Sequence, residues 1–214
     1  MTDPFDRTWA VVPLRGLATA KTRLGGELDR AARMRLVRAM AERTLSATRD
    51  AGTIAGTVLV TADPDAARLA ERYGARTLVQ LLPGLNEAIL EARAMAVAAG
   101  ASAIVVLPID LPAVSPAAID AVVESARANA GRGANAGTSR VVIVPDRHGH
   151  GTNVLVVAPP DAIEPAFGTD SRAEHRRRAE TAGAAFSELS GPLVLDVDTP
   201  DDLLAASGVG PPDR

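Results

Sequence analysis

Residues 102–112, SAIVVLPIDLP, decide the fold class of this 214-residue chain. The aliphatic run at 104–107 indicates a buried strand, as found in parallel sheets that are covered by helices on both faces. Asp110 follows the strand directly, between Pro108 and Pro112. Ligands of open α/β sheets bind beyond the carboxyl ends of the strands. The stretch therefore predicts a parallel sheet, with Asp110 at its ligand-binding edge.

Short β-branched runs alternate with longer amphipathic stretches along the rest of the chain, which predicts βα units. Asp29, Asp63 and Ser115 are suited to cap helices, and the last two precede a proline at the first helical position. Besides the strand at 102–108, strands are expected at 8–14, 57–62, 75–80, 140–145 and 153–159, and helices at 29–49, 64–72, 85–99, 116–128 and from Ser171 onward.

The length and the 47% apolar content fit one large α/β domain with a mostly parallel central sheet flanked by helices. No repeat and no linker divides the chain. We expect a flexible N-terminus over residues 1–7, the domain over 8–207 and a disordered tail over 208–214.

Composition excludes several functional classes. The net charge of -3 argues against a general nucleic-acid binder. Because the chain has no cysteine, it has no disulfides, no thiolate metal site and no cysteine nucleophile. It also lacks a basic leader and an apolar run of about 18 residues. We therefore expect a cytoplasmic protein that binds neither nucleic acid nor membranes.

The loop after the first strand, PLRGLATAKTRL at 13–24, holds Lys21, the only lysine among 23 Lys and Arg residues. A Walker loop needs a glycine immediately before its lysine, and this chain has Ala20 there. What remains is a glycine turn followed by Lys21 and Arg23, which could present two cations to the phosphates of a nucleotide. A solvated loop with ordinary surface charges explains the same residues equally well.

The acidic stretch LVLDVDTPDDL, at 193–203, contains two kinds of aspartate. Asp201 and Asp202 fit the first turn of a helix, where they complement its dipole. Asp196 and Asp198 lie two apart at an expected strand end, so both side chains leave the same face. Neighbouring carboxylates repel unless a cation compensates, so Asp196, Asp198 and Asp110 together predict a magnesium site. The alternative for Asp110 is a turn-forming aspartate before proline.

A glycine-rich turn lies at the start of DRHGHGTNVLVV, residues 146–157, and precedes the strand expected at 153–159. His148 and His150 lie two apart and lack further nitrogen or sulfur ligands, which disfavours zinc. The glycines suit a backbone that closes on a small polar substrate, with the Thr152 hydroxyl as donor. A flexible glycine hairpin is the alternative.

The next polar segment, FGTDSRAEHRRRA at 167–179, contains the capping-box spacing Ser171-x-x-Glu174. This spacing predicts a helix that starts at Ser171. The amide groups at its N-terminus, opened by Gly168, would form an anion site for a phosphate or carboxylate.

Six segments together resemble one protein family. VVPLRGLATAKTRL, GLNEAI, LPIDLP, GHGTN, FGTDSRAEH and DVDTPDDL occur in this order over nearly the whole chain. They resemble the 2-phospho-L-lactate guanylyltransferases of deazaflavin coenzyme F-420 biosynthesis, whose actinobacterial members use phosphoenolpyruvate. DVDTPDDL and the Asp-x-Pro are shared with other nucleotidyltransferases, whereas GHGTN together with FGxDSxxxH is more specific.

The resemblance implies a single-domain nucleotidyltransferase sandwich, Rossmann-like and of GT-A type. It implies an enzyme that joins GMP from GTP to a phosphorylated three-carbon acid and releases pyrophosphate. Arg15 departs from the family, which often has lysine there. The matching positions would be Lys21, Arg23 and Asp110 for catalysis, Pro13, Leu14, Gly84 and Asn86 for GTP, Thr152, Gly168 and Ser171 for the acid, and Asp110, Asp196 and Asp198 for Mg²⁺.

Two other functions remain open at this point. One is a molybdopterin guanylyl- or cytidylyltransferase-like enzyme, from whose usual first loop residues 13–16 depart. The other is a non-catalytic GTP-binding protein, which would not require three aspartates and a lysine. The sequence also leaves open whether the acid is phosphoenolpyruvate, 2-phospho-L-lactate or 3-phosphoglycerate, and whether the chain forms a homodimer.

Overall fold

The computed structural model describes residues 3–17, 20–21, 28–128, 139–197 and 202. In chain order the elements are β1 (Thr8–Pro13), α1 (Arg30–Asp50), β2 (Ile54–Thr61), α2 (Pro64–Arg72), β3 (Arg76–Val79), α3 (Leu85–Ala98), β4 (Ala103–Val106), α4 (Pro116–Ala128), β5 (Arg140–Pro145), β6 (Thr152–Ala158), α5 (Ser171–Thr181), β7 (Ala185–Glu188) and the 3₁₀ helix η3 (Pro192–Val194).

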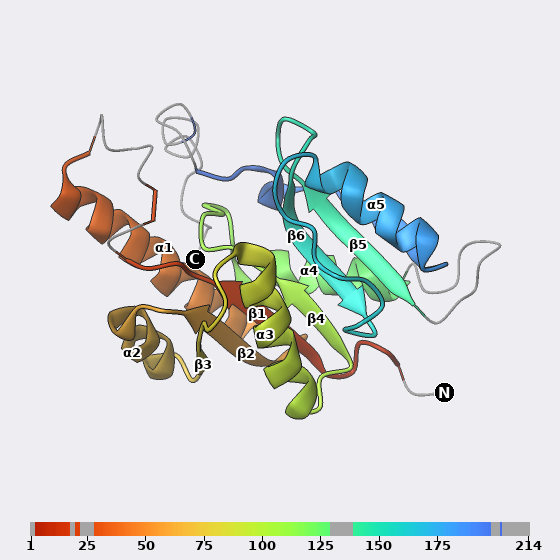
Figure 1. Cartoon of the computed structure of the whole chain (residues 1–214), viewed down its shortest axis with the longest axis horizontal. Helices are drawn as coiled ribbons and strands as arrows, with labels where there is room; N and C mark the ends of the chain where they lie inside the picture. Colours follow the sequence, from red (N-terminus) through yellow and green to blue (C-terminus); the bar gives the residue numbers. More distant parts are fainter. Residues whose placement is uncertain (1–2, 18–19, 22–27, 129–138, 198–201, 203–214) are drawn as a thin grey trace.

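The strands form one sheet in the order β3-β2-β1-β4-β6-β5-β7 (Figure 1). The six strands expected between residues 8 and 159 are present, and the mostly parallel α/β architecture is confirmed. β6 is antiparallel to both of its neighbours, β4 and β5, while the other pairs are parallel. β7, at one edge of the sheet, was not predicted.

Helices cover both faces of the sheet, and α3 and α5 lie over the same face (Figure 1). Side chains of β4 alternate between the two layers, as the period of a strand requires. Val105 packs on the side of α4 and α1, and Ile104 and Val106 pack on the side of α3. The sheet is therefore buried on both faces, which is why its strands read as continuous apolar runs.

The predicted helix starts are confirmed for three helices. The side chains of Asp29 and Asp63 accept hydrogen bonds from first-turn N–H groups of α1 and α2, at 2.7 and 2.9 Å. The Ser115 hydroxyl accepts one from the first turn of α4, at 3.2 Å. These caps satisfy donors that have no partner inside the helix.

The capping box predicted for α5 is wrong, although the helix does begin at Ser171. Asp170 occupies the cap position with φ 54°, and its side chain makes no capping hydrogen bond. Glu174 pairs instead with Arg177 and Arg178 in the next turn of the same helix. Two guanidinium groups within reach compete successfully with a backbone N–H for this carboxylate.

The strand expected before Asp196 is also wrong. Pro192–Val194 form η3, and residues 195–197 continue without regular structure. Val197 is buried, and its N–H donates to the Asp110 carbonyl at 2.9 Å. Asp198 and Asp201 lie outside the described residues. The buried Asp202 carboxylate pairs with Arg147 at 2.5 Å, which gives it a structural role.

The packed core includes a residue upstream of the domain boundary expected at residue 8. Phe5 is fully buried against the layer that holds α4, and Asp3 pairs with Arg127 of that helix at 2.6 Å. The tail at 208–214 lies outside the described residues. Within the part of the chain that the structure describes, no helix is both long and apolar enough to cross a membrane.

Asp63 does more than cap α2, and this leads to a stability prediction. Its second carboxylate oxygen accepts the Leu17 N–H at 2.8 Å, which fixes the loop after β1. Asp63→Ala should lower the free energy of unfolding by about 2 kcal/mol, because a cap and a further hydrogen bond are both lost. Asp29→Ala, which loses a cap alone, should lower it by about 1 kcal/mol. Urea unfolding measures both values, and equal losses would contradict the second role of Asp63.

Candidate active site

The carboxyl ends of two neighbouring strands place the first group of candidate residues. β1 and β4 are parallel, with Val11 opposite Val106, and the Leu107 N–H continues the pairing to the Val11 carbonyl at 2.9 Å. The loop that contains Lys21 follows β1, and Asp110 follows β4. Both segments therefore leave the sheet at the same edge, where open α/β sheets bind ligands.

Lys21 and Asp110, 89 residues apart in sequence, form an ion pair at this edge. The Lys21 Nζ lies 2.5 Å from Asp110 Oδ2, and the two side chains are only 9% and 21% exposed. Lys21 has φ 56°, a left-handed conformation that non-glycine residues adopt rarely and at a cost. A shielded cation held on a strained backbone at a sheet edge is a candidate catalytic group.

A third segment joins the pair. The hydrogen bond from the Val197 N–H to the Asp110 carbonyl places the half-buried Asp196 in the segment beside Asp110. Two neighbouring aspartates supply oxygen ligands of the kind that Mg²⁺ prefers. Across the described residues no three His, Cys, Asp or Glu side chains converge as a metal site. The predicted set of three needs Asp198, which lies outside them, as does Arg23.

Leu14, predicted to bind the nucleotide, has a structural place in the fold. Its side chain is 4% exposed and packs in the core with Val12 and helix α1. Its N–H donates to the Val60 carbonyl at 3.0 Å. Pro13 ends β1, opposite Val60. Any contact of Leu14 with a nucleotide would therefore come from its backbone.

The antiparallel direction of β6 brings the second group of candidate residues to the same edge. Because β6 runs against β4, its first residue, Thr152, lies toward the end where β4 finishes. Thr152 is 7% exposed. The next residue, Asn153, donates from its side chain to the Leu193 carbonyl at 3.0 Å, which holds the chain just before Asp196.

The turn before β6 packs against the start of α5, so the two more specific motifs are in contact. The N–H of Arg172 donates to the His150 carbonyl at 3.1 Å, and its guanidinium donates to the Gly149 carbonyl at 3.0 Å and to Glu188. Ser171 is buried, and its N–H lies 3.3 Å from the carbonyl of Gly168, which has φ 133°. Thr152, Gly168 and Ser171 thus belong to one connected region.

His175 lies inside this region and is fully buried. Its Nε2 accepts the Ala166 N–H at 2.9 Å, its Nδ1 lies 3.0 Å from the Thr152 hydroxyl, and the ring of Phe167 packs edge-on against the imidazole. Burial lowers the pKa of His175 to about 4, and the charge of Arg178 acts in the same direction. The imidazole is therefore neutral near pH 7.

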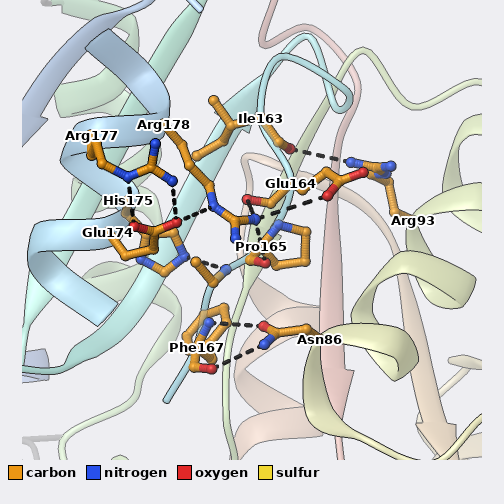
Figure 2. Close-up of polar contacts among 11 residues, drawn as sticks. Asn86, Arg93, Ile163, Glu164, Pro165, Phe167, Glu174, His175, Arg177 and Arg178 are labelled. Carbon is orange, nitrogen blue, oxygen red and sulfur yellow. Dashed lines mark hydrogen bonds and ion pairs between the residues drawn. The ribbon is translucent and has the colours of Figure 1, made fainter. Parts of the chain in front are cut away.

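Asn86, predicted to lie near guanine, bridges two parts of the structure. Its amide nitrogen donates to the Phe167 carbonyl at 3.0 Å, and its amide oxygen accepts the Phe167 N–H at 2.8 Å (Figure 2). Asn86 lies in the first turn of α3, two residues after the exposed Gly84, whose φ is 121°. The guanine roles of Gly84 and Asn86 both stay predictions, and Asn86 also has a backbone partner that the sequence did not reveal.

Sequence reasoning missed a set of side chains that hold the 163–167 segment. Arg93 of α3 donates to the Ile163 carbonyl at 3.2 Å, and Arg178 of α5 donates to the Pro165 carbonyl at 3.1 Å (Figure 2). Asn86 and His175 hold the end of the same segment. The one available signal was the spacing of Ser171 and His175, four apart on one helical face.

The buried neutral imidazole predicts a specific dependence of stability on pH. The unfolded chain takes up a proton on His175 below about pH 6.5, whereas the folded chain does so only near pH 4. The free energy of unfolding should therefore fall as the pH drops from 7 to 4, by roughly 3 kcal/mol from this residue. Glu174 and Arg178, the charged groups near the imidazole, remain ionised over most of that range.

Urea unfolding at several pH values, with His175→Gln as the control, checks this prediction. The variant lacks the titrating group but keeps the carboxylates, so the difference between the two pH profiles isolates His175. Parallel profiles would show that His175 takes up its proton equally in both states.

The chain is similar to known guanylyltransferases and nucleotidyl transferases. A phosphoenolpyruvate guanylyltransferase of Sphaerobacter thermophilus is 39% identical over 205 residues, covering 95% of this chain and 94% of its own. The enzyme of that name from Conexibacter woesei is 41% identical over 199 residues, covering 92% and 85%. A solved Methanothermobacter nucleotidyl transferase has a TM-score of 0.64 at 18% identity, covering 94% of this chain and 95% of its own, and so shares the fold.

A family model described as guanylyl transferase CofC like matches residues 8–207, which includes the whole span from β1 to the last described residue, Asp202. The match confirms the family predicted from the six sequence segments, and it includes both groups of candidate residues at the sheet edge. The chain belongs to the CofC-like guanylyl transferase family, and it is a nucleotidyltransferase enzyme.

Proposed function

We propose that this enzyme transfers GMP from GTP to phosphoenolpyruvate and releases pyrophosphate, in coenzyme F-420 biosynthesis. The observation that carries the proposal is the shielded Lys21–Asp110 pair, at the sheet edge where Thr152 also lies. The choice of acid is supported by relatives near 40% identity over more than nine tenths of the chain, which are named for phosphoenolpyruvate.

The reaction needs little covalent help from the protein. A phosphate oxygen of the acid attacks the α-phosphorus of GTP, the bond from that phosphorus to the bridging oxygen of the β-phosphate breaks, and pyrophosphate leaves with the electron pair. The attacking phosphate is already ionised near pH 7, so no general base is required. Catalysis then depends on in-line placement and on the neutralisation of charge.

Lys21 is suited to that second task. An ammonium is a compact charge on a rotatable stem, so it can follow an oxygen through the displacement, whereas the planar guanidinium of arginine is bound to a fixed geometry. Asp110 lies 2.5 Å from the Lys21 Nζ and so fixes the position of the positive charge that would contact the phosphates. The surrounding protein shields the pair from water. This shielding strengthens the interaction between the Lys21 ammonium and a phosphate.

The acidic residues fit a magnesium ion that enters with GTP. Asp110 and Asp196 lie in segments joined by a backbone hydrogen bond, and Asp198 follows them in sequence. A divalent cation here would neutralise charge on the triphosphate and on the leaving pyrophosphate. The nucleotide would be contacted by Arg23, Pro13, Leu14, Gly84 and Asn86. Thr152, Gly168 and Ser171 would bind the acid.

The proposal predicts pyrophosphate release that depends on both substrates. Purified protein is incubated with GTP, Mg²⁺ and, in turn, phosphoenolpyruvate, 2-phospho-L-lactate or 3-phosphoglycerate. We expect the highest kcat/KM with phosphoenolpyruvate, and strong preference for GTP over ATP, CTP and UTP. Equal turnover with CTP would favour the molybdopterin-type alternative, and GTP binding without release with any acid would favour a non-catalytic protein.

Substitution of Lys21 tests its role in the chemical step. Lys21→Ala should lower kcat by about 10² to 10³, as for the loss of one preorganised electrostatic donor, and change KM little. Lys21→Arg should be partly active. The exposed Arg15 provides the control, since Arg15→Ala should raise KM for GTP and leave kcat nearly unchanged. A rise in KM alone for Lys21→Ala would make Lys21 a binding residue.

A further inference from the structure

The hydrogen bonds of His175 define which of its nitrogens carries the proton. Nε2 faces the N–H of Ala166 at 2.9 Å, and a backbone N–H can only donate, so Nε2 is the acceptor. The neutral ring then has its hydrogen on Nδ1, which faces the Thr152 hydroxyl oxygen at 3.0 Å. The ring also hydrogen-bonds to the backbone of Ser171, one turn earlier in α5. We therefore assign the Nδ1-protonated form to this buried imidazole.

The assignment determines what the Thr152 hydroxyl can do. A hydroxyl oxygen that accepts from Nδ1–H cannot donate back to the same nitrogen, so its own hydrogen is directed to another acceptor. Thr152 lies at the start of β6, toward the sheet edge of Asp110. An anionic acid bound at that edge would offer oxygen acceptors. The imidazole thus orients a donor toward the substrate.

The same imidazole also fixes the chain that leads to Gly168. Ala166 and Phe167 are held by His175 from α5 and by Asn86 from α3 (Figure 2). Gly168 follows directly, and Ser171 begins the helix that carries His175. One side chain therefore connects the predicted acid-binding residues of two separate segments, Thr152 on one side and Gly168 on the other.

We propose that His175 is a positioning residue of the acid site, which orients the Thr152 hydroxyl as a donor and holds the 163–167 segment beside it. The inference rests on the proposed function, because that function assigns the acid to Thr152 and Gly168. It adds a residue that touches neither substrate but sets the geometry of groups that do.

Two conservative variants separate the two contacts of His175. An asparagine amide nitrogen takes the place of Nδ1, so His175→Asn keeps the bond to Thr152 and loses the one to Ala166. A glutamine amide oxygen takes the place of Nε2, so His175→Gln keeps the bond to Ala166 and loses the one to Thr152. Each should raise KM for phosphoenolpyruvate about tenfold, the equivalent of one hydrogen bond, with KM for GTP changed less than twofold.

A double-mutant cycle with Thr152→Val shows whether the glutamine variant acts through the hydroxyl. The effects of His175→Gln and Thr152→Val on KM for phosphoenolpyruvate should be non-additive, while those of His175→Asn and Thr152→Val should add. The matched structural control is Val123→Ala, a buried position in α4, which should lower the melting temperature and leave both KM values unchanged. Additive effects for both pairs, or equal rises in KM for both substrates, would overturn the positioning role.

Calorimetric binding of phosphoenolpyruvate separates this inference from the proposed function. If the wild-type protein turns over normally and the His175 variants have an unchanged KM, the positioning role alone is overturned. If the wild-type protein binds phosphoenolpyruvate without turnover and both His175 variants bind it more weakly, the proposed function is overturned and the positioning role is supported. Wild-type protein that neither binds nor reacts overturns both.

Discussion

The reversed direction of β6 between β4 and β5 is the constraint on which the site depends. In a fully parallel sheet, the start of this strand would lie at the edge opposite Asp110, on the far side of the core. Because β6 is antiparallel, Thr152 enters the sheet at the edge where β1 and β4 leave it. The segments proposed to bind the nucleotide come mainly from the parallel half of the sheet, and those proposed to bind the acid come from the other half. A single strand direction therefore brings the two groups together.

Charge is distributed differently in the two groups. Around Asp110 a cation is held largely shielded from solvent, at the edge where we propose that the phosphates bind. On α5 the charged side chains are paired at the surface and neutralise one another, as Glu174 does with Arg177 and Arg178. Beneath them the buried position is filled by His175, which can hydrogen-bond at both nitrogens without carrying a charge. The interior thus gains directional contacts while avoiding the cost of a buried ion.

Local signals were enough to predict much of the fold. Aliphatic runs marked six strands, and Asp29, Asp63 and Ser115 marked helix starts, because these features depend on neighbours within a few residues. The strand β7 and the irregular path to Asp196 depend on distant partners, among them Asp110. For the same reason the sequence identified Lys21 and Asp110 as candidates but gave no role to His175, and it did not reveal that Asn86 pairs with the backbone of Phe167.

The left-handed backbone at Lys21 has a cost for the stability of the fold, although the proposed reaction needs a lysine at this position. Such a conformation costs an L-residue about 1–2 kcal/mol, a cost that glycine largely avoids. Selection for stability alone would thus favour glycine at this position, the residue with no side chain to offer. With the catalytic role that we propose for it, Lys21 lowers the stability of the fold and supports turnover. Engineering this chain for heat resistance should therefore leave residue 21 untouched and seek its gains elsewhere in the fold.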